Sequence, residues 1–357
     1  MHYVKEPNFL TQNPLFTESN PGKALKANPL GFIDIGARGG VHLIVDALAK
    51  YTSVLAFEPD LEECERLRKD KHIAEHWSEF LLYPVALSNQ QGEASLKLLS
   101  SDTNHSLLSP NSDFVDRYNM VKWKEIGQCP LMTDTLDHVL FNELADHSNC
   151  GEFLKIDTQG TEYEILEGAK RTLTERTVAV VCEVSFCELY KNQKLFSDVE
   201  SFLRQYGFSF YGFPLFHHRS CKYLSKEQYA TRERAFYGDA VFFKDPFHPS
   251  KNIKLSERQS YTLFTCALLL GYYDFALELA KKNWVKNPEE ETRIQSLIQQ
   301  CAITEPQEAV VAVRALLNQV SQSPEEANVI VGSFVDQRRH LCDYNDVMNV
   351  SPLPRVI

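Results

Sequence analysis

The feature that most constrains the fold is a regular alternation of short apolar runs with longer amphipathic stretches. The apolar runs lie at 31–35, 53–58, 80–85, 152–157, 178–184, 208–211 and 240–243. The run at 178–182 is continuously apolar, as expected of a central parallel strand that helices cover on both faces. Between runs, Ile165, Leu166, Ala169 and Leu173 recur at helical spacing. This order of strand, helix and strand predicts a doubly wound α/β fold.

The segments on either side of this unit differ from it in character. Pro7, Pro14, Pro21 and Gly22 lie in a polar setting near the N-terminus, which predicts an irregular lead-in. From about residue 255 onward the pattern is helical, and a short break at 271–274 predicts a pair of antiparallel helices. We therefore expect three parts. They are the lead-in at 1–28, an α/β domain at 29–248 and an all-α domain at 249–357.

Composition excludes several classes of protein. The 357 residues are 43% hydrophobic and 24% charged, which is typical of globular proteins. The net charge of −11 argues against a general nucleic-acid binder, because such binding depends on cationic side chains. The most apolar long stretch, at 261–273, is shorter than a membrane span, and the N-terminus has no apolar signal core. Nine cysteines without a C-x-x-C pair favour reduced thiols and a cytoplasmic location.

Acidic residues at two consecutive strand ends indicate the kind of ligand. Asp34 closes the first strand and is followed by Gly36, Gly39 and Gly40, where glycines let a ligand approach the backbone. The spacing lacks the G-x-G-x-x-G of dinucleotide folds, and an acid here would repel a pyrophosphate and attract a cationic amino group. Glu58 ends the second strand, where a carboxylate can accept both hydroxyl protons of a ribose. Together these features predict S-adenosylmethionine. A nicotinamide dehydrogenase is an alternative that the missing phosphate loop disfavours.

Several segments resemble the FkbM-type methyltransferases, class I S-adenosylmethionine enzymes that mostly methylate hydroxyls of sugars and natural products. The resemblance covers about residues 31–244. Its segments are D-I-G-A at 34–37, A-F-E-P at 56–59, V-A-L-S at 85–88, D-T-L-D at 134–137, L-K-I-D-T-Q-G-T-E at 154–162 and L-E-G-A at 166–169. The family usually has Asn where this chain has Arg38. The resemblance implies a Rossmann-like sheet of seven strands with an antiparallel last strand.

The resemblance also implies which residues contact the cofactor. The residues expected at its methionine part are Asp34, Gly36, Ala37 and Gly40. Those expected at its ribose are Glu58 and Pro59, and those expected at its adenine are Ala86 and Leu87.

Candidates for the chemistry follow the later strands. Asp157 lies at a strand end beside the expected cofactor, and we expect it to act as the general base or to orient the acceptor hydroxyl. His105, in a polar loop, is the second candidate for the base. Gln159 and Glu183 are expected to bind the substrate, whereas Glu162 is expected only to favour the dipole of its helix. In some related sugar methyltransferases this strand end binds Mg²⁺, which Asp157 and Glu183 would hold. The metal is an alternative here and not a prediction.

These residues predict an S-adenosylmethionine-dependent O-methyltransferase that acts on a sugar, a glycan precursor or another small hydroxyl-bearing acceptor. An N- or protein methyltransferase on the same fold is one alternative. A non-catalytic scaffold that works through the helical tail is another. The tail is expected to mediate dimerisation, to bind a protein partner or to dock the acceptor, and the sequence does not choose between these roles.

Overall fold

The computed structural model describes residues 6–145, 150–225, 229, 231–249, 252–303 and 306–337. Their contacts divide the chain into two compact units. The larger unit comprises Tyr3–Cys221 and Glu233–Ile303, and the smaller comprises Met1–His2, Lys222–Arg232 and Thr304–Ile357. The sheet and the candidate site lie in the larger unit.

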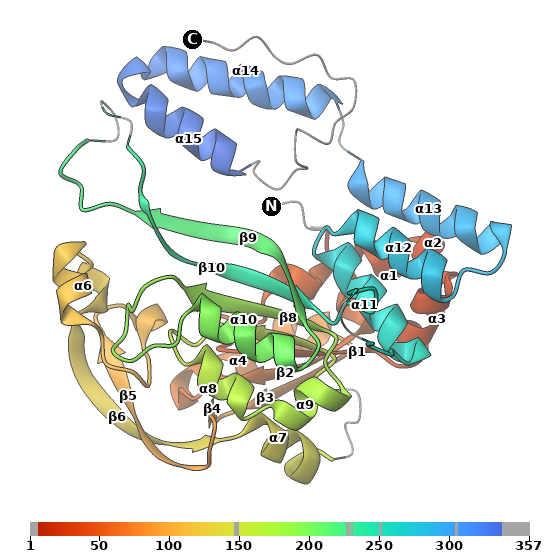
Figure 1. Cartoon of the computed structure of the whole chain (residues 1–357), viewed down its shortest axis with the longest axis horizontal. Coiled ribbons are helices and arrows are strands. Elements are labelled where there is room, and N and C mark those ends of the chain that lie inside the picture. The colour runs from red at the N-terminus through yellow and green to blue at the C-terminus, as the bar shows by residue number, and fades with distance from the viewer. Residues whose placement is uncertain are drawn as a thin grey trace. The chain divides into compact units, whose positions relative to one another are not determined.

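A seven-stranded sheet forms the centre of the larger unit (Figure 1), in the order β3-β2-β1-β7-β8-β10-β9. The strands are β1 (Leu30–Ile35), β2 (Thr52–Phe57), β3 (Glu79–Tyr83), β7 (Phe153–Ile156), β8 (Ala179–Ser185), β9 (Ser209–Arg219) and β10 (Arg234–Phe243). β1, β2, β3, β7 and β8 are mutually parallel, and β10 runs antiparallel to both β8 and β9. The predicted doubly wound sheet with an antiparallel last strand is confirmed.

The order of the sheet places its crevice between β1 and β7. From β1 the chain continues to β2 and then β3 on one side of β1, whereas β7 and the later strands lie on its other side. In register, Asp34 of β1 pairs with Lys155 of β7, and Glu183 of β8 pairs with Asp239 of β10. Ligands of open α/β sheets bind at such a switch point, beyond the carboxyl ends of the strands. Ionisable side chains from four strands therefore lie near the expected binding edge.

Helices cover both faces of the sheet. On one face lie α8 (Glu162–Glu167), α9 (Lys170–Glu175) and α10 (Phe196–Gln205), whose apolar residues form one core cluster with Leu154 and Phe242. On the other face, η1 (Leu43–Tyr51) and α11 (Glu257–Leu269) form a second cluster with Phe32 and Phe153. Alternate residues of each strand thus face opposite cores, as the pleat requires.

The N-terminal segment is helical and not irregular as predicted. It forms α1 (Phe9–Gln12), α2 (Pro14–Thr17) and α3 (Asn20–Ala27). Pro14 and Pro21 lie in the first turns of α2 and α3, where a proline loses no helical hydrogen bond. The side chains of Asn13 and Ser19 cap these helices. Three apolar side chains of the segment are fully buried in the core, namely Leu10, Phe16 and Leu25.

The helical tail contributes to the core of the larger unit. α11 and α12 (Tyr273–Asn283) form the predicted helix pair, and α13 (Pro288–Ala302) follows. α11 is buried from Ser260 to Leu269, because it packs on the sheet core and also contacts α3, η1 and α12. The domain boundary predicted at residue 249 therefore falls inside this unit.

The smaller unit holds α14 (Pro306–Gln322), η5 (Pro324–Glu326) and α15 (Ala327–Gln337). The end of the predicted all-α domain, at 338–357, lies outside the described residues.

Arg258 of α11 ties this helix to the sheet. Its guanidinium donates to both carboxylate oxygens of Glu152 at 2.7 Å and to the backbone carbonyls of Asn28 and Pro29. Glu152 is only 5% exposed and also accepts from the backbone N–H of Gly31 at 3.0 Å. The pair therefore joins α11, the start of β7 and the start of β1.

Arg258→Met is expected to lower the free energy of unfolding by about 3 kcal/mol, because it leaves the Glu152 carboxylate buried without its ion pair. Urea denaturation of the full chain measures this loss. Arg204→Met, which removes an exposed pair with Glu200, should change the free energy of unfolding by less than about 1 kcal/mol. Equal losses in the two variants would contradict the structural role of Arg258.

A second, three-stranded sheet is inserted before β7. It consists of β4 (Ala86–Leu87), β5 (Gly92–Leu99) and β6 (Glu125–Asp134) in the order β4-β6-β5, with β5 and β6 antiparallel. The short elements α4 (Leu61–Lys69), α5 (Lys71–His76), η2 (Asp102–Asn104), α6 (Ser112–Arg117), η3 (Val121–Trp123), α7 (Leu136–His138) and η4 (Val139–Glu143) complete the unit. The loop that contains η2 and His105 follows β5.

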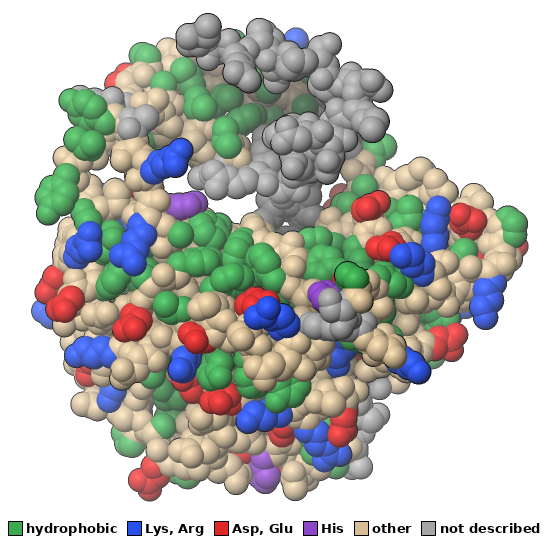
Figure 2. Space-filling view, in the orientation of Figure 1, with side chains coloured by type: hydrophobic (Ala, Val, Ile, Leu, Met, Phe, Trp, Pro, Cys, Tyr) green, Lys and Arg blue, Asp and Glu red, His purple; other side chains and the backbone are tan. Residues whose placement is uncertain are grey.

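The surface mixes charges of both signs on the face that Figure 2 shows. Apolar side chains gather there along the outer edge of the sheet, where Phe210 and Leu215 of β9 are each 36% exposed. Among the described residues, no helix combines the length and the apolar character that a membrane crossing requires. Every cysteine in that part of the chain is free, and Cys342 lies outside it.

Candidate active site

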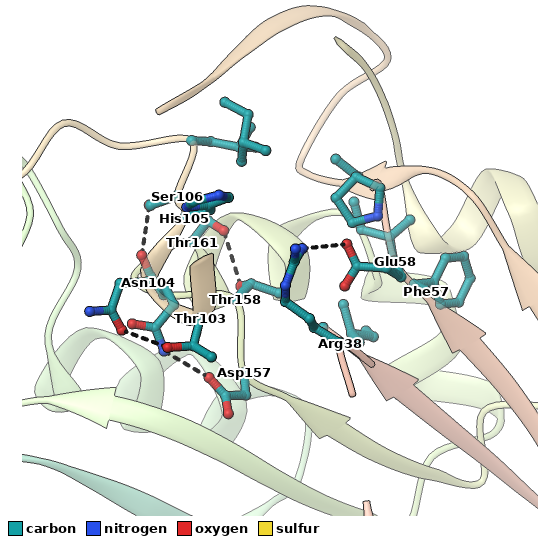
Figure 3. A pocket seen from close by; sticks show the side chains of 18 of the residues that line it. Arg38, Phe57, Glu58, Thr103, Asn104, His105, Ser106, Asp157, Thr158 and Thr161 are labelled. Atoms are coloured by element: carbon teal, nitrogen blue, oxygen red, sulfur yellow. Dashed lines mark hydrogen bonds and ion pairs between the residues drawn. The ribbon is translucent and has the colours of Figure 1, made fainter. Parts of the chain in front are cut away.

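A cavity of about 320 Å³ lies at the carboxyl edge of the sheet. Its walls come from the turn after β1, the end of β2, β4, the loop at 102–107 and the turn after β7 (Figure 3). Most of the residues predicted for the site line it, namely Gly36, Glu58, Pro59, Ala86, Leu87, His105, Asp157 and Gln159. The strand ends have therefore brought together side chains that lie up to about 120 residues apart in the sequence, as expected for a parallel sheet.

The turn after β1 packs directly on the turn after β7. Gly36 has a φ of 86°, and its N–H and that of Ala37 donate to the carbonyl of Phe57 at 3.1 and 3.0 Å. A Cβ atom at Gly36 would lie 2.0 Å from the backbone oxygen of Asp157. The N–H of Asp157 in turn donates to the carbonyl of Ile35 at 3.1 Å. A glycine is required here because both the φ angle and the close approach exclude a side chain.

Gly36→Ala is expected to lower the free energy of unfolding by about 3 kcal/mol and to abolish cofactor binding, because the new methyl group displaces the backbone of Asp157. Gly39→Ala is the matched control. Gly39 has a similar φ of 88°, but a Cβ there would meet nothing within 4 Å, so we expect a loss of only about 1 kcal/mol from strain. Urea denaturation and calorimetry with S-adenosylmethionine measure both effects. A Gly36→Ala variant as stable as Gly39→Ala would contradict the close packing of the two turns.

Glu58 presents a buried carboxyl group at the end of β2. It is 4% exposed, and its Oε1 accepts from the backbone N–H of Asp60 at 2.9 Å. Burial raises the pKa of Glu58, while the Asp60 N–H and the nearby Arg38 guanidinium oppose this rise. A carboxylate with few protein donors has capacity left to accept hydroxyl protons from a ligand.

Arg38 is a lining residue whose function the sequence did not predict. Its guanidinium donates to Asp60 Oδ2 at 2.9 and 3.0 Å, and it lies 3.9 Å from Glu58 Oε1 and 3.8 Å from Asp102 Oδ2. Figure 3 shows Arg38 facing Glu58 across the cavity wall. The only sequence signal at this position was that Arg38 replaces the Asn usual in the family. That difference did not reveal that Arg38 lies among three acidic side chains, those of Glu58, Asp60 and Asp102.

Three of the predicted cofactor residues do not line the cavity. Asp34 is 1% exposed; its Oδ2 accepts from the N–H of His42 at 2.7 Å, and its Oδ1 lies 3.4 Å from Lys155 Nζ. Ala37 is buried, and Gly40 donates its N–H to the carbonyl of Ala37 at 3.0 Å. The contact predicted between Asp34 and the cofactor stays a prediction. Asp34 lies within β1, where its side chain is enclosed, so these residues shape the turn and do not form the cavity wall.

Lys155 and Asp157 form an ion pair that the sequence did not predict. Lys155 Nζ lies 3.6 Å from Asp157 Oδ2 as well as 3.4 Å from Asp34 Oδ1. Burial alone would lower the pKa of Lys155, but Asp34 and Asp157 outweigh burial and raise it. Lys155 is therefore a permanent ammonium group. The side chain of Asp157 is 37% exposed and remains accessible to an acceptor.

Gln159 lies between Asp157 and Glu183. Its Nε2 donates to Asp157 Oδ1 at 3.1 Å and to Glu183 Oε2 at 3.3 Å. Glu183 is not among the residues that line the cavity, and its direct contact with substrate stays a prediction. Burial and the adjacent Asp157 raise the pKa of Glu183 well above its ordinary value. The same two causes raise the pKa of Asp239 to about 6.

Glu162 has a larger structural role than the predicted interaction with a helix dipole. Its Oε1 accepts from the backbone N–H groups of Thr158 and Gly160 at 2.9 and 3.0 Å. Burial raises the pKa of Glu162 to about 7, although these backbone N–H groups favour its charged form. Glu162 thereby closes the turn that carries Asp157.

His105 is oriented as a hydrogen-bond donor. Its Nδ1 accepts from the backbone N–H of Leu99 at 3.1 Å, which places the proton of the neutral ring on Nε2. Burial, followed by the charge of Arg38, lowers the pKa of His105 and favours this neutral form. This geometry disfavours the predicted role of base and offers the cavity a donor.

The acidic cluster does not fit a bound metal ion in this arrangement. Asp157, Glu162 and Glu183 bring their carboxylate oxygens within 4.8 Å of one another. However, the amide N–H groups of Gln159 point between two of these carboxylates, and the ammonium group of Lys155 adjoins Asp157. These donors supply positive charge where a cation would need oxygen ligands. We therefore derive no step through a metal.

The glycine turn after β1, the acid at the end of β2 and the carboxylate after β7 thus lie together at one edge of the sheet. The family described as "Methyltransferase FkbM domain" matches residues 34–210. This match, which spans just under half of the chain, confirms the resemblance to the family.

Comparison with solved structures gives distant likenesses. An FkbM methyltransferase from Methylobacillus flagellatus is 12% identical, with a TM-score of 0.32, and the match covers 60% of this chain and 43% of that chain. The magnesium protoporphyrin IX methyltransferase of Synechocystis is 9% identical, with a TM-score of 0.30 and coverage of 65% and 74%. TrmK of M. capricolum is 9% identical, with a TM-score of 0.28 and coverage of 79% and 94%. The chain thus spans less than half the length of the FkbM structure. No curated protein matches it.

Proposed function

We propose that this protein is an O-methyltransferase that transfers the methyl group of S-adenosylmethionine to a hydroxyl of a sugar or glycan precursor. The observation that carries this proposal is the setting of Asp157. Its carboxylate is accessible beside the cavity, with Oδ1 held by the Gln159 amide and Oδ2 adjacent to Lys155. A fixed, charged carboxylate suits the orientation and deprotonation of an acceptor hydroxyl.

The volume and the lining of the cavity support S-adenosylmethionine as its ligand. Its volume of about 320 Å³ lies within the range of small-molecule sites. Glu58 would accept the ribose hydroxyl protons, the turn at Gly36 would lie against the amino-acid part, and Ala86 with Leu87 would flank the adenine. When bound, S-adenosylmethionine supplies an electrophilic methyl group.

The residues of the chain then have two tasks in the reaction. Asp157 accepts the proton of the acceptor hydroxyl, a contribution of about 10²-fold to 10⁴-fold for a general base. The fixed turn and the Gln159 amide hold that carboxylate in one place, and such positioning contributes several kcal/mol of barrier reduction, on the order of 7 in the best-oriented cases. The ammonium group of Lys155 lies 3.6 Å from Asp157 Oδ2 and forms an ion pair with this carboxylate.

The remaining parts of the proposal concern the partner and the tail. The acceptor is a small hydroxyl-bearing molecule. The sequence predicted dimerisation, partner binding or acceptor docking for the tail, whose helices α14 and α15 belong to the smaller unit.

A transfer assay tests the proposal. The full chain would be incubated with labelled S-adenosylmethionine and a panel of nucleotide sugars, oligosaccharides and cell extracts, with and without Mg²⁺. We expect label in a methyl ether of a sugar, with the same yield in both conditions. Label on nitrogen or on protein would overturn the choice of hydroxyl. An absence of cofactor binding in calorimetry would overturn the enzymatic assignment and favour the scaffold.

A further inference from the structure

We propose that Tyr190 is a positioning residue for methyl transfer, acting through Gln159. This inference rests on the proposed role of Asp157. Tyr190 follows β8 in the chain and is not among the residues that line the cavity. Its influence on the reaction would therefore be indirect.

The hydroxyl of Tyr190 connects two walls of the cavity. The side chain is 1% exposed, and its oxygen lies 3.1 Å from Gln159 Oε1 and 3.1 Å from the backbone carbonyl of Asn104. One wall is the turn after β7 that carries Asp157, and the other is the loop that carries His105. Because a phenol has a single proton, Tyr190 donates to one of these two oxygens at a time. It is a shared donor for both walls.

The amide of Gln159 has one orientation that satisfies its neighbours. Both of its N–H groups point at carboxylates, those of Asp157 and Glu183. Its Oε1 must then face away from them, and Tyr190 supplies the donor at that place. The opposite orientation would place the amide oxygen against the carboxylate oxygen of Asp157, which now accepts from Nε2. Tyr190 therefore favours the arrangement in which Gln159 donates to Asp157.

The backbone of Gln159 also depends on its surroundings. Its φ of 60° lies in the left-handed region, which residues other than glycine rarely adopt. The hydroxyl of Ser106 donates to its carbonyl oxygen at 2.7 Å. A strained conformation of this kind persists only where neighbouring groups hold it in place. The side chain and the backbone of Gln159 are thus both held from outside the turn.

Tyr190 is itself fixed in position. Gln193 Oε1 accepts from the N–H groups of Leu189 and Tyr190 at 3.0 and 3.2 Å. A Cβ atom at Gly160 would lie 2.9 Å from Tyr190 Cδ2, so the ring packs against the turn itself. Replacement by phenylalanine keeps this packing and removes only the hydroxyl group.

Tyr190→Phe is expected to lower kcat about tenfold, on the best acceptor of the panel, because the amide of Gln159 becomes free to turn away from Asp157. The dissociation constant for S-adenosylmethionine should stay within about twofold, since the cavity wall near Glu58 is untouched. Tyr118→Phe is the matched control, because Tyr118 is 4% exposed and lies in the same core cluster as Tyr190. It should change neither quantity.

A double variant separates positioning from general structural support. If Tyr190 acts through Gln159, then Tyr190→Phe in a Gln159→Ala background should cause no further loss of kcat. Losses that multiply in the double variant would overturn the proposal. So would a Tyr190→Phe variant with normal kcat, or one in which cofactor affinity falls as much as kcat.

A measurement without an acceptor distinguishes this inference from the proposed function. The side-chain amide resonances of Gln159 in nitrogen-15 NMR, assigned by their loss in Gln159→Ala, should shift in Tyr190→Phe and not in Tyr118→Phe. Unchanged resonances in Tyr190→Phe would overturn the inference even if the enzyme methylates a sugar. Shifted resonances in a protein that shows no methyl transfer would support the link to Gln159 and overturn the proposed function alone.

Discussion

Asp157→Asn is expected to lower the rate of methyl transfer by about 10²-fold to 10⁴-fold, the contribution of a general base, while the dissociation constant for S-adenosylmethionine stays within about twofold. Asparagine keeps the size of the side chain and an oxygen that can accept from the Gln159 amide. It cannot take a proton from the acceptor hydroxyl, and it removes the negative charge 3.6 Å from Lys155. Initial rates at saturating donor and acceptor, together with calorimetry, measure the two effects.

The matched control for this variant is Asp46→Asn. Asp46 is likewise an aspartate paired with a basic side chain, His76, but it is buried, lies in η1 and does not line the cavity. We expect its rate of methyl transfer to equal that of the wild type at a temperature where both are folded. A wild-type rate in Asp157→Asn would remove the catalytic role of this carboxylate.

Glu58→Gln is expected to weaken S-adenosylmethionine binding by about tenfold to a hundredfold. A hydrogen bond to a charged group contributes about 1.5 to 3 kcal/mol, and 1.4 kcal/mol corresponds to about a factor of ten in the dissociation constant. Glutamine keeps one acceptor oxygen and places an N–H where the ribose offers a donor. Calorimetric titration measures the loss, and Glu62→Gln, an exposed neighbour in the first turn of α4, serves as the control.

The same variant should remove a pH dependence. Burial raises the pKa of Glu58 above that of a free glutamate, so the group takes up a proton at a higher pH than usual. The protonated form accepts hydroxyl protons less well, and cofactor affinity should therefore fall as the pH is lowered through this raised pKa. The affinity of Glu58→Gln should change less over the same range. A wild type whose affinity is flat with pH, or an undiminished affinity in Glu58→Gln, would contradict the role of this carboxyl group.

The sequence predicted well those features that follow from backbone periodicity. The parallel strands and the meeting of Glu58 and Asp157 at one cavity follow from apolar runs that end at the same edge of the sheet. The antiparallel last strand and the place of Ala86 were predicted from the resemblance to the family instead. Residues at the ends of strands can be predicted from the sequence because apolar runs mark the strands. The prolines near the N-terminus misled the prediction, because Pro14 and Pro21 begin helices and do not interrupt them.

The features that the sequence did not predict depend on side-chain contacts between distant segments. In the sequence, Lys155 is only one residue of a segment that resembles the family. The pairing of β7 with β1 places it beside Asp34, and its ammonium group forms ion pairs with Asp34 and Asp157. Glu162 reaches back over its own turn, and Tyr190 reaches Gln159 from a segment 31 residues further along the chain. Hydrogen bonds of this kind have no sequence period, so composition and spacing do not reveal them.

The most direct test is an experimental structure of the full chain with S-adenosylhomocysteine, the product of methyl transfer. We expect the ribose diol on the carboxylate of Glu58, the adenine between Ala86 and Leu87, and the sulfur atom on the side of the cavity where Asp157 lies. A nucleoside bound elsewhere, or bound with its sulfur pointing away from Asp157, would contradict the proposed site.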